Sequence, residues 1–402
     1  MRTLGPGAFG TYGLAMAFVG YLQILLEYGF WLSGTRRAVA VLHDPAALSK
    51  LFWAIYGTKL ILLFLALPPM ALFIFLVPAL HNCVEIIIVL AIGVVGASIF
   101  PLWLLQARGL LKDFAWILTL LKISNLAVFI FIRGPGDVRA LAYIFAIQSI
   151  MHGLIGQYAA LKGIKISAPT SAWIRDSFNQ LRADFSIFIS QLGGTLISNS
   201  TSVVLGTTAG PESLGAYMVA DKIVRAAASL TIPVSQAVLP MSANLFQFDT
   251  PRNAFNFLRK FSFVAGGAIT FGCLFLAVFA PFVIHLVSGT RSPEIILCLR
   301  ILAFYPIFVF ANNLFGPQVL LQIEKDASIL KSNLLGCAFG LLLHPILIPI
   351  FHARGAAAIV FLAEATVTPL LIYFVYIAYK AMRKNGNFDR IKSAWIMNCP
   401  PS

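Results

Sequence analysis

The stretch GPGAFGTY at residues 5–12 recurs in skeleton as GPESLGAY at residues 210–217. Both copies read G-P-x-x-[FL]-G-x-Y, and the second begins about half the chain length after the first. Each copy opens a long apolar segment. Recurrence of a pattern along a chain is the sequence sign of internal repetition. The repeat therefore predicts that the protein consists of two similar halves.

The composition is that of a membrane protein. Hydrophobic residues make up 59% of the 402 residues, charged residues only 11%, and the mean hydropathy is +0.88. Soluble domains are roughly 45–50% apolar and about 25% charged. Cytoplasmic loops of membrane proteins collect Lys and Arg, so the net charge of +14 needs no nucleic-acid partner. The five cysteines are scattered, without the spacing of a disulfide framework or zinc site.

Hydropathy predicts an all-α protein with many spans. A helix needs about 20 apolar residues to cross a bilayer, and this criterion gives about eleven segments. The connections between them are too short to hold a folded domain. The predicted spans are 10–34, 51–77, 84–107, 113–133, 138–161, 184–207, 213–240, 262–288, 296–320, 328–351 and 355–380.

The repeat indicates how the spans are organised. The second copy follows the predicted span 184–207, whereas no span precedes the first copy in this sequence. We therefore expect about twelve spans in the full arrangement, with the first one missing here. Two six-helix lobes, 1–165 and 166–380, would surround a central cavity and share one orientation. Most Lys and Arg outside the spans fall on one side, which predicts a cytoplasmic basic tail at 381–402.

Charges inside spans are costly, so they are the candidate functional residues. Asp221, Lys222 and Arg225 follow the second copy of the motif, and their i,i+3 and i,i+4 spacing places them near one helix face. They predict a cationic site for an anionic ligand, with Asp221 tuning it. The alternative is a neutralised Asp221–Arg225 pair between helices. The aligned positions of the first half carry no charge.

Four further charged residues within the predicted spans are also candidates. Lys122 faces either a cavity or a buried hydrogen-bond partner. Lys59 either faces the cavity or extends toward the interface with its ammonium group. Glu27 and Glu364 are candidates for ion coupling, and the alternative for each is a structural, hydrogen-bonded acid.

The sequence lacks the motifs of several enzyme classes. There is no G-x-x-x-x-G-K-[ST], H-E-x-x-H or G-x-S-x-G. We therefore expect no nucleotide or other cofactor, no resident metal and no catalytic residues, and the sequence favours a transporter over an enzyme.

Two blocks of sequence resemble Wzx-type polysaccharide flippases. The first is LGPGAFGTY at 4–12 followed by LLEYGFWLSGTR at 25–36, and the second runs from Gly215 through Lys222 to Pro240. Arg300-Ile301-Leu302, Pro306 and Gly316-x-Gln318-x-Leu320 fit the same family. Glu27 stands where members often have an acidic residue.

The resemblance implies a bacterial inner-membrane protein of the multidrug/oligosaccharidyl-lipid/polysaccharide exporter superfamily. Such a flippase moves undecaprenyl-diphosphate-linked oligosaccharide across the bilayer by alternating access, for O-antigen lipopolysaccharide, capsule or exopolysaccharide. A polysaccharide polymerase and a chain-length regulator would be further partners. Lys222 and Arg225 would hold the diphosphate, helped by Lys122 and Lys59.

Two other functions stay open. A cation-coupled multidrug exporter of the same superfamily would favour acidic cavity residues, whereas cations outnumber clear mid-span acids here. A membrane-embedded polysaccharide polymerase or ligase acting on the same lipid is disfavoured by the absence of a large outer loop. The sequence names neither the sugar nor the coupling ion.

Overall fold

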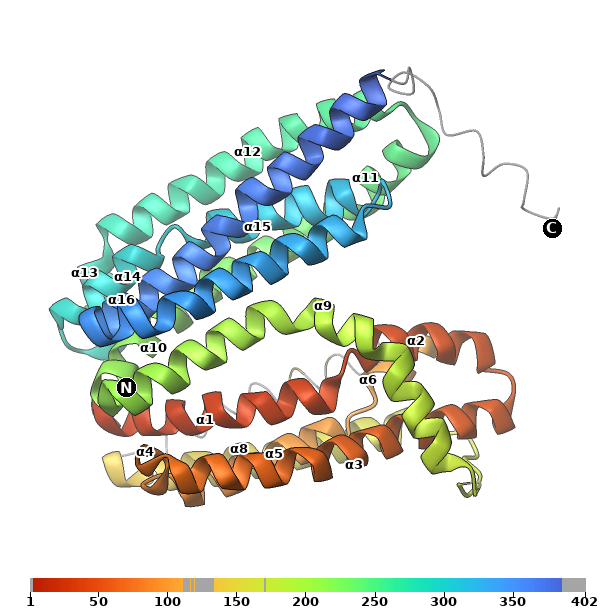
Figure 1. Cartoon of the computed structure of the whole chain (residues 1–402), viewed down its shortest axis with the longest axis horizontal. Helices are drawn as coiled ribbons and strands as arrows, with labels where there is room; N and C mark the ends of the chain where they lie inside the picture. Colours follow the sequence, from red (N-terminus) through yellow and green to blue (C-terminus); the bar gives the residue numbers. More distant parts are fainter. Residues whose placement is uncertain (1–2, 111–115, 117–118, 120–133, 170, 385–402) are drawn as a thin grey trace. The chain divides into compact units, whose positions relative to one another are not determined.

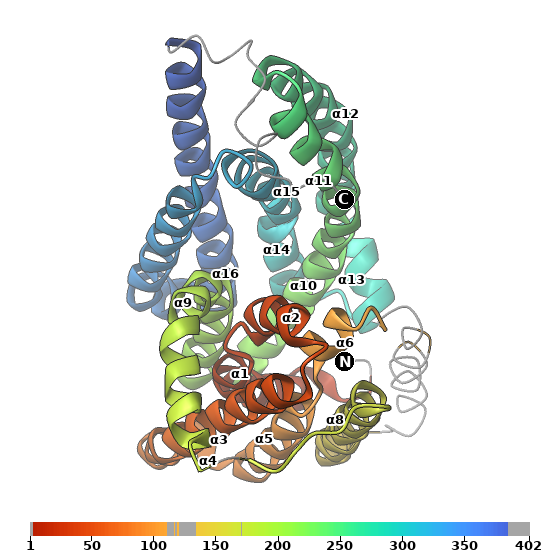
Figure 2. The same cartoon turned by 90° about the vertical axis from the view of Figure 1, so that its right-hand side faces the viewer.

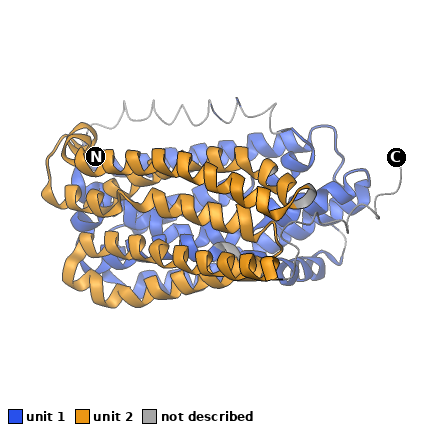
Figure 3. Cartoon of the chain, turned by 90° about the horizontal axis from the view of Figure 1, so that it is seen from above, with its two compact units in different colours: residues 1–215 blue, residues 216–402 orange. Residues whose placement is uncertain are grey.

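A computed structural model describes residues 3–110, 116, 119, 134–169 and 171–384. These residues form helices and connecting turns, with no β-strand among them. The chain forms two compact units, residues 1–215 and 216–402, coloured separately in Figure 3. The all-α prediction is confirmed. The division into lobes 1–165 and 166–380 follows from the repeated motif and stays a prediction.

The first unit is a bundle around α1. Helix α1 packs against α3, α5 and α9, while α5 also lies against α8, as Figure 1 and Figure 2 show. The bounds are α1 (Gly5–Glu27), α2 (Phe30–Val41), α3 (Pro45–Leu76), α4 (Pro78–His81), α5 (Val84–Ser98), α6 (Leu102–Ala107), η1 (Pro135–Asp137), α8 (Val138–Leu161) and α9 (Trp173–Thr208). The unit ends within α10 (Gly210–Ser229).

The two motif copies begin α1 and α10 in the same way. Gly5 and Gly210, the first residue of each copy, have φ of 75° and 84°, a left-handed conformation that favours glycine. The proline that follows lies in the first helical turn, where the missing N–H costs no intrahelical hydrogen bond. The G-P pair of the motif is therefore a helix-start signal.

The copies also cross each other at their later glycines. A Cβ on Gly10 would lie 1.7 Å from the carbonyl oxygen of Pro211, and a Cβ on Gly215 would lie 2.2 Å from that of Pro6. The contact is reciprocal: Gly10 of the first copy lies against Pro211 of the second, and Gly215 of the second lies against Pro6 of the first. Small residues allow helices to approach closely in a membrane. The motif therefore specifies a close helix crossing within the first unit.

An ion pair between α2 and α9 helps to hold the first unit together. The Arg37 guanidinium donates to the Asp184 carboxylate at 2.7 Å, and Asp184 also accepts from Gln180 at 2.5 Å. Asp184 is fully buried, whereas the Arg37 side chain is 36% exposed.

We expect Asp184→Ala to lower the free energy of unfolding by about 2 kcal/mol. Removing one partner of a fully buried pair costs about 3–5 kcal/mol, and the exposure of Arg37 reduces this. Lys50→Ala is the control, because Lys50 is 62% exposed and pairs with Asp176 at 3.5 Å, so its loss should cost under about 1 kcal/mol. Thermal unfolding of the purified protein in detergent compares the two. Equal midpoints would contradict a structural role for Asp184.

The second unit consists of the remaining helices. Helix α12 packs on α11 and α15, and α16 packs on α14, α15 and η2. The bounds are α11 (Thr231–Phe248), α12 (Pro251–Val278), α13 (Ala280–Ser288), α14 (Pro293–Leu302), α15 (Tyr305–Phe315), the π-helical η2 (Gly316–Leu320) and α16 (Asp326–Lys384). Phe246, Ala254, Leu258, Leu314 and Val319 form a buried apolar cluster in this unit.

Helix α16 contains two of the predicted spans. Its 59 residues would extend about 90 Å at 1.5 Å per residue, far beyond the ~30 Å hydrocarbon core. The chain bends sharply at His352 (φ 48°, ψ −125°), and the two halves run back along each other in Figure 1. Gly336 of the first half lies against Val367 of the second.

Several predicted spans differ from the observed helices. The span 10–34 is interrupted at Tyr28 and Gly29, where both residues have positive φ, and the span 213–240 is divided between α10 and α11. The predicted span 113–133 lies outside the described residues, apart from 116 and 119, as does most of the 381–402 tail. Eight helical stretches of the described chain are long and apolar enough to cross a membrane, and α9 is not among them. A multi-pass membrane protein is therefore confirmed, whereas the number of eleven spans stays a prediction.

Candidate functional site

The charged group on α10 is centred on an Asp221–Arg225 pair. Arg225 Nε donates to Asp221 Oδ1 at 2.8 Å and to Oδ2 at 2.7 Å. The hydroxyl of Tyr217, one turn earlier, donates to Asp221 at 3.5 Å. The predicted i,i+4 proximity is therefore present, and the structure supports the pairing that the sequence left as an alternative.

Arg225 and Lys222 have different surroundings. The Arg225 guanidinium carbon lies 5.6 Å from the centroid of the Tyr305 ring of α15, a cation–π arrangement. The Arg225 side chain is 37% exposed, and Lys222 is exposed. Asp221 thus partly neutralises Arg225, whereas the ammonium group of Lys222 is accessible. This part of α10 therefore keeps a net positive charge.

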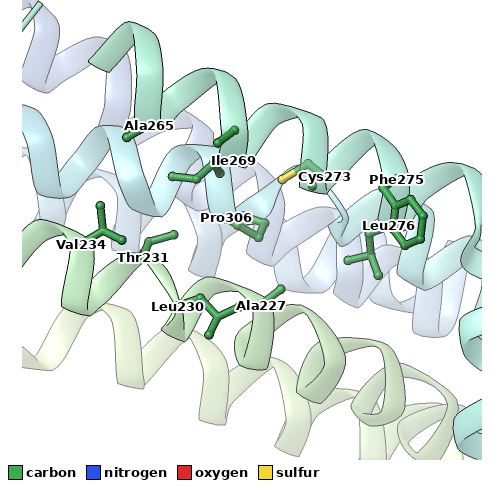
Figure 4. Close-up of a pocket in the computed structure, with 12 residues that line it drawn as sticks. Ala227, Leu230, Thr231, Val234, Ala265, Ile269, Cys273, Phe275, Leu276 and Pro306 are labelled. Carbon is green, nitrogen blue, oxygen red and sulfur yellow. The ribbon is translucent and has the colours of Figure 1, made fainter. Parts of the chain in front are cut away.

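An apolar pocket of about 450 Å³ follows directly along the same helices (Figure 4). It is formed by α10, α11, α12 and α15, with Ala227 and Leu230 on one wall and Ile269, Cys273 and Leu276 facing them. Ala227 lies two residues after Arg225, and Pro306 of the pocket follows Tyr305.

The pocket offers little to a polar ligand. The one hydroxyl among its lining residues belongs to Thr231, which already donates to the Ala228 carbonyl at 2.7 Å. The second unit therefore contains both cationic groups and, among the same helices, a space suited to aliphatic carbon.

Glu364 of α16 belongs to a polar cluster in the second unit. Its carboxylate accepts from Asn312 Nδ2 at 2.6 Å, and the Thr368 hydroxyl donates to Asn312 Oδ1 at 2.7 Å. This geometry supports a hydrogen-bonded acid. Its predicted role in ion coupling stays a prediction.

Lys59 lies inside the first unit. It is 8% exposed, donates to the Ser98 carbonyl, and lies 5.9 Å from the Phe30 ring and 5.4 Å from the Tyr56 ring. The ammonium group is therefore held among helices rather than extended to an exposed surface. Glu27, at the end of α1, is exposed and accepts from Gln23 at 2.9 Å. Lys122 lies outside the described residues.

Gln318, which in the sequence stands out only as part of a motif, connects two helical elements of the second unit by hydrogen bonds. Gln318 of η2 is 2% exposed, accepts from the Ser242 hydroxyl at 2.6 Å and donates to the Ser235 carbonyl at 2.7 Å. A π-helical turn often accompanies functional sites. The position of Gln318 in an apolar predicted span could have indicated this role, because a buried amide needs polar partners.

These helices define the class of protein, a multi-pass membrane protein whose described residues are helical. A structure described as the inward-facing conformation of a multidrug resistance MATE family transporter of the MOP superfamily is similar with a TM-score of 0.68 at 16% identity, over 96% of each chain. This similarity concerns the fold alone.

The chain belongs to the polysaccharide biosynthesis protein family, whose sequence profile matches residues 1–246. A protein named "Putative O-antigen transporter" from Escherichia coli (strain K12) is 26% identical over 93% of this chain and 90% of its own length. One of the same name from Shigella dysenteriae is 22% identical over 94% and 93%. The family assignment confirms the resemblance noted in the two motif blocks.

Proposed function

We propose that this protein is a flippase for undecaprenyl-diphosphate-linked oligosaccharide in the bacterial inner membrane. It would supply the assembly of a surface polysaccharide such as O-antigen, capsule or exopolysaccharide. The family, the names of the relatives and the transporter fold support this function. The observation that carries it is that α10 holds Arg225 and Lys222 and also helps to form the apolar pocket with α11, α12 and α15.

The proposed ligand has the two chemistries that this region offers. Its diphosphate is an anion that guanidinium and ammonium groups bind through charge-assisted hydrogen bonds. Its polyprenyl tail is aliphatic and gains free energy when it leaves polar surroundings. Arg225 and Lys222 would hold the diphosphate, and the apolar pocket would take the first isoprene units.

Transport would follow alternating access between two lobes. Asp221, Glu27 or Glu364 would couple the cycle to an ion gradient, and the C-terminus would be cytoplasmic. The polymerase and the chain-length regulator that act on the flipped lipid would be its partners.

Complementation tests the proposed function. A strain that lacks its flippase but retains the biosynthetic enzymes for this protein's own polysaccharide receives the gene, and surface polysaccharide is quantified at matched membrane abundance. We expect restoration by the wild type. A multidrug exporter would instead leave surface polysaccharide absent and raise drug tolerance, and a polymerase would alter polymer length without restoring transport.

A further inference from the structure

A second cavity, of about 170 Å³, lies within the first unit where five segments meet. Glu27 ends α1, Phe30 and Trp31 begin α2, Lys59 comes from α3, Ser98 ends α5, and Trp103 comes from α6. The chain changes direction at Tyr28 and Gly29. Glu27 before this break and Phe30 and Trp31 after it therefore line the same cavity. The segment LLEYGFWLSGTR at 25–36 therefore contributes Glu27, Phe30 and Trp31 to the lining of this cavity.

Two of the residues that line the cavity carry hydrogen-bond donors with unmet capacity. The Lys59 ammonium has three donors, and the described residues supply one acceptor, the carbonyl of Ser98. Trp103 is 1% exposed, and its indole Nε1 has no hydrogen-bond partner among the described residues. A buried donor without an acceptor costs about 1–3 kcal/mol. An occupant that brings oxygen acceptors would recover this cost.

The charge of the cavity selects among oxygen-bearing ligands. The Glu27 carboxylate lines the same space as the Lys59 ammonium, so the cavity carries both signs. The two charges offset each other, so the cavity has no net positive charge to attract a diphosphate. A hydroxyl group both donates and accepts, so a polyol can bond Glu27 and Lys59 together.

The lining residues and the volume of the cavity further restrict which ligand it can hold. Phe30, Trp31, Phe100 and Trp103 line it, and Trp31 is 45% exposed. Flat apolar faces suit the C–H faces of a sugar ring, with a few polar groups fixing its orientation. Pockets for drug-sized ligands measure roughly 300–1,000 Å³, so this cavity holds one ring rather than an oligosaccharide.

We propose that the cavity around Lys59 is a subsite for one pyranose ring of the transported oligosaccharide. The inference rests on the proposed function. It gives Lys59 the role of a sugar ligand in place of a helper to the diphosphate.

Saturation-transfer NMR on the purified full chain in detergent tests the subsite. The probes are glucose, galactose, N-acetylglucosamine and glucuronate, each alone, and inorganic pyrophosphate. We expect at least one sugar to receive saturation, with the signal reduced at least fivefold by Lys59→Met and by Trp103→Phe, which keeps an aromatic ring and removes only the N–H. Lys50→Met on the same helix and Trp53→Phe in another pocket are the matched controls and should retain the signal.

Three results would overturn the subsite. They are no signal from any sugar, a sugar signal that survives both Lys59→Met and Trp103→Phe, and Lys59-dependent binding of pyrophosphate, observed by phosphorus NMR, without sugar binding. The proposed function fails separately, when the wild type does not restore surface polysaccharide in the complementation strain. Restoration combined with variant-independent sugar signals would refute the subsite alone.

Discussion

Replacing Arg225 by glutamine is expected to reduce surface polysaccharide at least tenfold at equal membrane abundance. Hydrogen bonds to charged groups contribute about 1.5–3 kcal/mol, and each 1.4 kcal/mol is a factor of ten in affinity. Lys222→Ala should reduce transport as well, by a smaller factor, because an exposed ammonium group binds as a single point charge. Surface polysaccharide in the complementation strain is the measurement.

A double variant separates binding from structure at Arg225. If Arg225 only neutralises Asp221, then Asp221→Asn combined with Arg225→Gln removes both charges and should restore transport. If Arg225 binds the diphosphate, the double variant stays as defective as Arg225→Gln, while Asp221→Asn alone retains more transport than either. Arg139→Gln is the matched control, because Arg139 also pairs with a carboxylate, that of Glu85 at 3.1 Å, but is 69% exposed in the first unit. Wild-type polysaccharide from both Arg225→Gln and Lys222→Ala would refute the cationic site.

The crossing of α1 and α10 at the two motif copies leaves no space for an added side chain. Gly10→Ala and Gly215→Ala are each expected to reduce the amount of folded protein in the membrane severalfold. The added Cβ would lie 1.7 Å and 2.2 Å from carbonyl oxygens, so the backbones of α1 and α10 must separate. Overpacking of this kind costs about 1–3 kcal/mol or more.

Gly194→Ala is the matched control for the crossing. Gly194 lies in α9 of the same unit, and a Cβ there meets nothing within 4 Å. This variant should be as abundant as the wild type, since alanine favours a helix over glycine by about 1 kcal/mol. Membrane abundance and thermal unfolding in detergent compare the three variants. Equal values for all of them would contradict the close crossing.

Local patterns predicted much of this structure. The apolar composition indicated an all-helical membrane protein, and the G-P pairs mark the starts of α1 and α10. The i,i+4 spacing of Asp221 and Arg225 predicted their proximity because a helix alone determines it. The sequence could not choose between a free cationic site and an ion pair, since that depends on the rotamer of Arg225 and on Tyr305 from another helix.

The features that were missed depend on contacts between distant parts of the chain. Asp184 and Arg37 are 147 positions apart, and only the packing of α9 against α2 within the first unit brings them together. Gln318 similarly joins η2 to Ser235, 83 positions earlier. The break in the first predicted span arises from positive φ at Tyr28 and Gly29, and hydropathy carries no information about that angle.

Reconstitution in liposomes shows whether the protein moves the lipid-linked oligosaccharide across a bilayer. The purified protein is placed in liposomes that contain undecaprenyl-diphosphate-linked oligosaccharide, and the appearance of the glycan at the opposite leaflet is followed with a membrane-impermeant lectin. Protein-free liposomes and the Arg225→Gln variant are the references. We predict lectin-accessible glycan that increases with time for the wild type, and at least tenfold more slowly for Arg225→Gln. A wild-type rate equal to that of protein-free liposomes, in vesicles where the folded protein is verified, would contradict the proposed flippase function.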